Sequence, residues 1–99
     1  MSAAGGRIQL RNPDPKKRGT RIGADTYAIA RRAALATLPA KAPGMTLTDF
    51  RATMAKRLVR AKGWDRSLSA SWYSMAIKLD LEARGEITRT GSPQRLIRG

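Results

Sequence analysis

The strongest constraint on the fold is the stretch of residues 67–98, where a helical pattern runs directly into two short alternating segments. Its first part, residues 67–84, contains neither Gly nor Pro, and Gly85 follows. Because glycine adopts positive φ without strain, it is a typical residue for ending a helix. The two alternating segments are separated by Gly91-Ser92-Pro93, which is typical of a turn. This stretch therefore predicts a helix followed by a two-stranded hairpin.

Apolar side chains occupy two adjoining faces of this predicted helix. At about 100° per residue, Trp72 shares one face with Leu79, and Ile77 shares the other with Leu81. A helix with so wide an apolar arc must be covered by more than one neighbour, and we expect Trp72 to lie in the core. The remaining polar stripe is expected to face outward. It consists of Ser67, Ser71, Ser74, Lys78 and Glu82.

Two further helices are predicted upstream. Asp25 or Thr26 can cap a helix that continues to Leu38, because this segment is rich in alanine and Pro39 follows it. Thr46 with an acidic residue three positions later resembles a capping box, which predicts the start of the next helix. The buried stripe of that helix is expected to contain Leu47, Phe50, Met54 and Leu58. Its cations are expected to lie on the solvated faces.

The N-terminal segment is expected to be a flexible basic arm, residues 1–24, that precedes a domain of residues 25–99. Arg7–Arg11 alternates like a short strand, and the Asn-Pro-Asp-Pro run after it ends the strand. This segment is therefore a candidate for a third short strand. Three cations follow it, Lys16, Lys17 and Arg18. Such an arm can track a phosphate backbone or simply remain solvated.

The charge balance points to a polyanionic partner. The 99 residues contain 20 Lys and Arg against 7 Asp and Glu, which gives a net charge of +13. An excess of this size creates a field that attracts phosphate groups. The alternative is a general effect of charge on solubility. With only 5% aromatic residues, the chain is poorly suited to stack the bases of a single strand.

Several classes of function are disfavoured by what the sequence lacks. Without Cys or His, the chain has no disulfides, no thiolate zinc sites and no histidine-based acid–base chemistry. Its carboxylates are scattered, and no phosphate-binding loop or nucleophile motif is present. We therefore expect no enzyme, no cofactor and no metal. No apolar run is long enough to cross a membrane, and no signal-like segment begins the chain, so we expect a soluble cytoplasmic protein.

The run Leu79-Asp80-Leu81-Glu82-Ala83-Arg84-Gly85-Glu86-Ile87 resembles the end of the third helix in winged helix-turn-helix proteins. In that family the glycine turns the chain into the wing. The resemblance covers residues 25–98 in the order of elements, and it implies a mainly α fold with a small β-hairpin (α+β). Three helices would be followed by a two-stranded wing. The whole chain, including its RNPDP and GSPQRL segments, also resembles a family of small uncharacterised bacterial proteins.

The winged-helix resemblance further implies a DNA-binding surface. In that family the third helix commonly enters the major groove, and the wing contacts the flanking backbone. Carried onto this chain, the helix residues that face bases would be Ser71, Ser74 and Lys78, and the wing residues that face phosphates would be Arg89 and Arg95. The expected nucleic-acid-binding set is completed by Arg98, Arg51, Lys16, Lys17 and Arg18.

The charge of the third helix shapes the functional expectation. Two cations balance two acids there, and the polar stripe offers no Arg or Asn for reading bases. We therefore expect backbone-dominated binding to duplex DNA with modest sequence preference, as in a small transcriptional regulator associated with the nucleoid. One alternative is a protein-interaction winged helix that forms a homodimer. The other is an RNA-binding or ribosome-associated protein.

Overall fold

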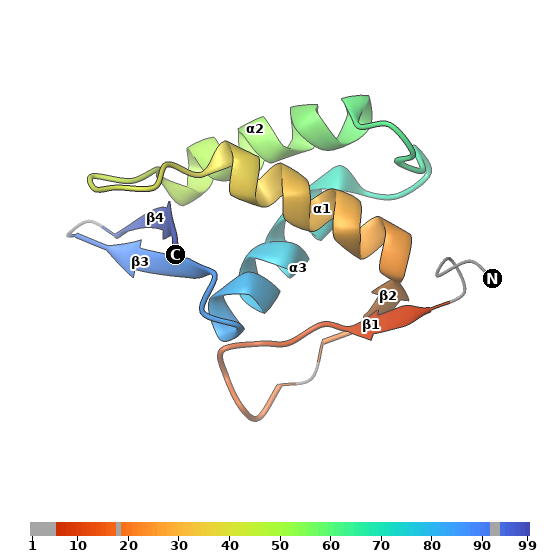
Figure 1. Cartoon of the computed structure of the whole chain (residues 1–99), viewed down its shortest axis with the longest axis horizontal. Coiled ribbons are helices and arrows are strands. Elements are labelled where there is room, and N and C mark those ends of the chain that lie inside the picture. The colour runs from red at the N-terminus through yellow and green to blue at the C-terminus, as the bar shows by residue number, and fades with distance from the viewer. Residues whose placement is uncertain (1–5, 18, 92–93) are drawn as a thin grey trace.

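A computed structural model describes residues 6–17, 19–91 and 94–99 of the chain. The described part contains three helices and four short strands, and the predicted order of three helices followed by a hairpin is confirmed. The helices form a cluster with β3–β4 at one end and β1–β2 at the other (Figure 1). The elements, in chain order, are β1 (Arg7–Gln9), β2 (Arg21–Gly23), α1 (Ala24–Thr37), α2 (Leu47–Arg60), α3 (Ala70–Ala83), β3 (Ile87–Thr90) and β4 (Arg95–Arg98).

The strands form two separate antiparallel pairs, so the chain has a mixed α+β architecture. β3 pairs with β4, and Ser92 and Pro93 of the predicted turn lie outside the described residues. The segment between α1 and α2 adds a bridge to β4. The N–H of Met45 donates to the carbonyl of Leu96 at 2.9 Å, and the N–H of Leu96 donates back at 2.7 Å. The hairpin is thereby joined to the chain that enters α2.

Two helix starts follow the expected capping chemistry, and one does not. The Thr46 hydroxyl accepts a hydrogen bond from the Asp49 N–H at 3.1 Å, as predicted for α2. Ser69 caps α3 by accepting from the Trp72 N–H. The prediction that Asp25 or Thr26 caps α1 is wrong, because α1 already begins at Ala24, directly after β2. The Ala24 N–H donates to the Gly6 carbonyl at 2.9 Å, so strand pairing continues into the helix.

The core lies between the three helices and the hairpin. It is built on Phe50, Met54 and Leu58 of α2, which are fully buried as predicted, and Trp64 is also buried. Leu47, which was expected on the same stripe, is exposed at the first position of α2. The other members of the core are Ala30, Ala34, Leu38, Ile77, Leu81, Ile87 and Leu96.

The predicted orientation of α3 is right for the face of Ile77 and Leu81 and wrong for the faces of Trp72 and Ser74. Ser74, Ile77 and Leu81 are fully buried, whereas Trp72, which was expected in the core, is 46% exposed. Residues at this spacing share one face of a helix, and that face points almost opposite to Trp72. The small Ser74 fits the buried face because its hydroxyl donates to the Ala70 carbonyl at 2.6 Å, so the hydroxyl is hydrogen-bonded within the helix.

The segment expected to be a flexible arm contains two paired strands. Ile8 lies opposite Ile22, and the Leu10 N–H donates to the Thr20 carbonyl at 3.1 Å. Leu10 and Ile22 are both buried. Alternation in the sequence predicted the first of these strands, whereas the second was not predicted and leads straight into α1.

A single buried carboxylate ties this segment to the helices. Asp80 of α3 is fully buried and accepts hydrogen bonds from the Arg11 N–H at 2.8 Å and from the Tyr27 hydroxyl at 2.7 Å. The Nε of Arg84 donates to both of its oxygens, at 3.0 and 2.9 Å. Burying a carboxylate is costly unless its oxygens are hydrogen-bonded and its charge is paired. Asp80 meets both conditions with donors from three parts of the chain.

We expect Asp80→Asn to lower the free energy of unfolding by about 2–3 kcal/mol, because Tyr27 and Arg84 lose an ionised acceptor. Urea unfolding measures this change. The matched control is Asp25→Asn, which removes an exposed carboxylate from the first turn of α1 and should cost less than about 1 kcal/mol. Equal losses in the two variants would contradict a central role for Asp80.

The same contact makes the ionisation of Tyr27 a second test. Burial, the hydrogen bond to Asp80 and the charge of Asp80 raise the pKa of Tyr27 to about 12. A folded-state pKa above the unfolded value favours the neutral, folded form. The stabilisation from Tyr27 is therefore complete below pH 10 and is lost as the pH rises toward 12. The difference between the ultraviolet titrations of wild type and Tyr27→Phe isolates this group, and a Tyr27 midpoint near 10 would contradict the contact.

Candidate nucleic-acid interface

The structure does not present the expected polar stripe of α3 to solvent. Ser74 is fully buried and Lys78 is only 5% exposed, so the expectation that they face bases is wrong. Ser71 is exposed, and its hydroxyl accepts a hydrogen bond from the Nη2 of Arg51 at 3.1 Å. Of the three expected contacts on α3, only Ser71, near the start of the helix, is accessible, and its partner Arg51 lies on α2.

Lys78 is buried because it belongs to an ion-pair network with the hairpin. Its Nζ lies 2.6 Å from the Oε1 of Glu82, and the Nε of Arg89 donates to the other carboxylate oxygen at 2.5 Å. Burial alone would raise the pKa of Glu82, but the hydrogen bonds from Arg89 and Lys78 outweigh it and hold the pKa below its usual value. The hydrogen bond to Glu82 also raises the pKa of Arg89. The charge of Arg89, one of the expected wing residues, is therefore balanced within the protein.

The remaining cations of the expected set do not form one surface. Arg95 is half-buried and Arg98 is exposed on β4. Lys16 and Lys17 are exposed in the loop between β1 and β2, and Arg18 lies outside the described residues. That loop and α2 lie on opposite sides of the molecule (Figure 1). A single flat ligand contact cannot include both.

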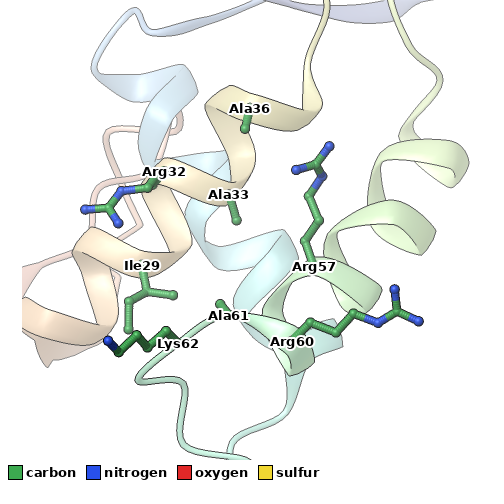
Figure 2. Close-up of a pocket in the computed structure, with 8 residues that line it drawn as sticks. All are labelled: Ile29, Arg32, Ala33, Ala36, Arg57, Arg60, Ala61 and Lys62. Atoms are coloured by element: carbon green, nitrogen blue, oxygen red, sulfur yellow. The ribbon is translucent and has the colours of Figure 1, made fainter.

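A different group of cations gathers around a cleft between α1 and the end of α2. The cleft has a volume of about 430 Å³. Arg32 and Lys62 extend on one side of it, and Arg57 and Arg60 lie on the other (Figure 2). Its floor is apolar and consists of Ile29, Ala33, Ala36 and Ala61. We refer to these eight residues as the α1–α2 cleft.

Among the described residues, the four cations of the α1–α2 cleft form no ion pairs, unlike Lys78, Arg84 and Arg89. In the described parts of the chain, ion pairs join Arg31 to Glu86, Lys78 and Arg89 to Glu82, and Arg84 to Asp80. No ion pair within those ranges involves Arg32, Arg57, Arg60 or Lys62. Arg57 and Arg60 also lie in the last turn of α2, where positive charge interacts favourably with the helix dipole.

Sequence reasoning missed this site for an identifiable reason. Arg57 and Arg60 belong to a cation run that was assigned to a solvated face of α2, and both are indeed exposed. Their position beside Arg32 depends on how α1 packs on α2, and no spacing within one helix reveals that contact. The available signal was the excess of arginine on α2 without matching acids, because arginine forms forked hydrogen bonds to phosphate and carboxylate groups.

The described residues offer neither a metal site of the usual kind nor a membrane-spanning helix. Among residues 6–17, 19–91 and 94–99, no group of three or more acidic, Cys or His side chains is arranged to hold a metal ion. Within the same residues, no helix has the length and apolar character needed to cross a bilayer. The chemistry that the residues of the α1–α2 cleft offer is the binding of anions by arginine and lysine.

Comparison with known proteins assigns the chain to a family without supplying an activity. No curated protein and no solved structure matches it significantly. Residues 7–96 match a Family of unknown function (DUF6958). The matched range begins at β1 and includes both N-terminal strands, the three helices and part of the hairpin. Because the match covers nearly the whole chain, the protein belongs to this family of unknown function, DUF6958.

Proposed function

We propose that this protein binds nucleic acid, most favourably duplex DNA, through contacts to the phosphate backbone. The observation that carries the proposal is the set of four cations without acidic partners around the α1–α2 cleft, in a chain of net charge +13. Each phosphate that a Lys or Arg neutralises releases bound counterions from DNA, which favours association. The carboxylates of α3 do not weaken this surface, because they pair with Lys78, Arg84 and Arg89.

The scaffold is proposed to be a winged helix. The order of α1, α2, α3 and the β3–β4 hairpin is that of the winged helix-turn-helix proteins that the sequence resembles. The bridge between Met45 and Leu96 supports the comparison, because it adds a short segment before α2 to the edge of the hairpin. The β1–β2 pair is an addition to that plan, and it packs at the other end of the helices (Figure 1).

The contacts are proposed to position the DNA more than to read its sequence. The exposed part of α3 carries Ser71 and Trp72, neither of which makes the forked contacts that distinguish base pairs. Contacts to phosphate fix the position of a protein on DNA but carry no sequence information directly. We therefore propose modest sequence preference and strong dependence on salt.

Fluorescence anisotropy of a labelled generic duplex at several salt concentrations tests the proposal. Affinity should fall steeply as salt rises, and Arg57→Ala/Arg60→Ala should make the slope of log K against log salt shallower by up to about 2. Arg89→Ala/Arg95→Ala removes the same charge from the hairpin and should change the slope less, because Glu82 already holds Arg89.

Three results would count against this function. Binding that does not change between low and moderate salt would exclude the backbone mechanism. A larger slope change in the hairpin variant would move the contact from the α1–α2 cleft to the wing. A structured RNA that displaces the duplex at equal salt would favour the RNA-binding alternative.

A second candidate function, self-association, rests on the half-exposed Trp72. Its ring lies 4.7 Å from that of Tyr73, centroid to centroid. Trp72, Met75 and Leu79 line a groove of about 210 Å³ between α3 and the β1–β2 loop. Exposed tryptophan beside apolar groups is typical of protein interfaces. This surface supports the alternative of a protein-interaction module that forms a homodimer.

Sedimentation velocity over a wide range of protein concentration tests this candidate. Wild type should show a reversible dimer, and Trp72→Ala should raise its dissociation constant at least about tenfold, because tryptophan anchors are often worth 2 kcal/mol or more. Leu47→Ala is a matched control that removes another exposed apolar side chain from the start of α2. A wild-type protein that stays monomeric throughout would rule out this dimer.

A further inference from the structure

We propose that the α1–α2 cleft is a binding site for a small organic anion: a molecule with an apolar body and one carboxylate, sulfonate or phosphate group. The cleft volume of about 430 Å³ lies within the range of pockets that hold small ligands. Both its apolar floor and the four cations around it, which form its rim, are accessible to solvent. The proposal concerns a ligand distinct from nucleic acid and does not rest on the proposed function.

The floor of the cleft is held by rigid elements. Ile29, Ala33 and Ala36 project from α1, and Ala61 directly follows α2. The turn after α2 is fixed by a hydrogen bond from the Trp64 N–H to the Ala61 carbonyl at 3.2 Å, and the Trp64 side chain is buried. The cleft therefore needs little rearrangement to accept a ligand, which lowers the entropic cost of binding.

The turn also keeps Lys62 close to the floor. Gly63 has a φ of +87°, a conformation that side chains other than glycine rarely adopt, and a Cβ added there would lie 3.4 Å from the Cδ1 of Ile29. The chain therefore passes directly beside the apolar floor. Figure 2 shows Lys62 below Ile29, with its amino group pointing away from Arg57. One end of the cleft thus combines an apolar wall with a positive charge.

The combination of floor and rim selects an amphipathic anion over simpler ligands. A neutral apolar molecule on the floor would displace water from nearby guanidinium groups without offering an acceptor, which is unfavourable. An inorganic anion could contact the arginines but would leave the floor in water. A molecule with both parts covers the floor and accepts charge-assisted hydrogen bonds from Arg57, whose forked donors match carboxylate and phosphate geometry and extend beside Ala36 (Figure 2).

Support of the α2 dipole is the simpler explanation for Arg57 and Arg60, and it makes a different prediction. A dipole effect needs only positive charge in the last turn, so it is satisfied by lysine and involves no ligand. A ligand site depends in addition on the space above Ala36, which is exposed at the cleft. A larger side chain at Ala36 would fill that space without changing the charge at the end of α2. It should therefore weaken ligand binding and leave the dipole interaction unchanged.

The test is a fluorescence titration with 1-anilinonaphthalene-8-sulfonate, a probe that has an aromatic body and one sulfonate. Wild type should bind it saturably, and Arg57→Ala/Arg60→Ala should raise the dissociation constant at least about tenfold. Ala36→Leu, which narrows the cleft, should weaken binding by a similar factor. N-phenyl-1-naphthylamine, which lacks the sulfonate, should bind wild type at least about tenfold more weakly.

Lys41→Ala/Arg66→Ala is the charge-matched control, because it removes two exposed cations outside the cleft. It should leave the dissociation constant for the sulfonate probe unchanged. Circular dichroism of each variant establishes that it is folded. The proposal is overturned if wild type does not bind the probe, if binding survives both cleft variants, or if Trp72→Ala abolishes binding while the cleft variants retain it.

Discussion

The buried carboxylate of Asp80 is the interaction on which the arrangement of this small protein depends. It accepts hydrogen bonds from the backbone of the N-terminal segment, from the Tyr27 hydroxyl on α1 and from Arg84 at the end of α3. A buried charge of this kind stabilises only the arrangement that supplies all its donors, since losing one leaves a costly imbalance. One side chain thus joins the β1–β2 pair to the helices, and it fixes which face of α3 points inward.

The orientation of α3 decides how charge is distributed over the molecule. With Lys78 and Asp80 turned inward, the three carboxylates of α3 and the hairpin entry pair with neighbouring cations. Among the described residues, the four cations of the α1–α2 cleft take part in no ion pair, so their positive charge is left for a ligand. Both proposals, nucleic-acid binding and a small-anion site, start from these four cations without ion pairs. They differ in whether the apolar floor of the cleft also contacts the ligand.

Sequence predicted the features that depend on local chemistry. The Thr46 cap, the helix end before Gly85 and the hairpin all depend on residues close together in the chain. The exposed face of α3 was predicted wrongly because two of its faces are apolar, and a serine such as Ser74 can be buried when its hydroxyl bonds the preceding turn. The α1–α2 cleft was missed because Arg32 and Arg57 lie far apart in sequence, and only the packing of two helices brings them together.

The most direct test of the charge partition is to map a generic DNA duplex onto the ¹⁵N-labelled protein by NMR at low salt. Our account predicts that the largest amide shift changes occur in α1 and around the end of α2, near Arg32, Arg57 and Lys62. The changes should fade as salt is added, because the contacts are made to phosphates. Changes concentrated in α3 and the β3–β4 hairpin, with the α1–α2 cleft unaffected, would contradict it.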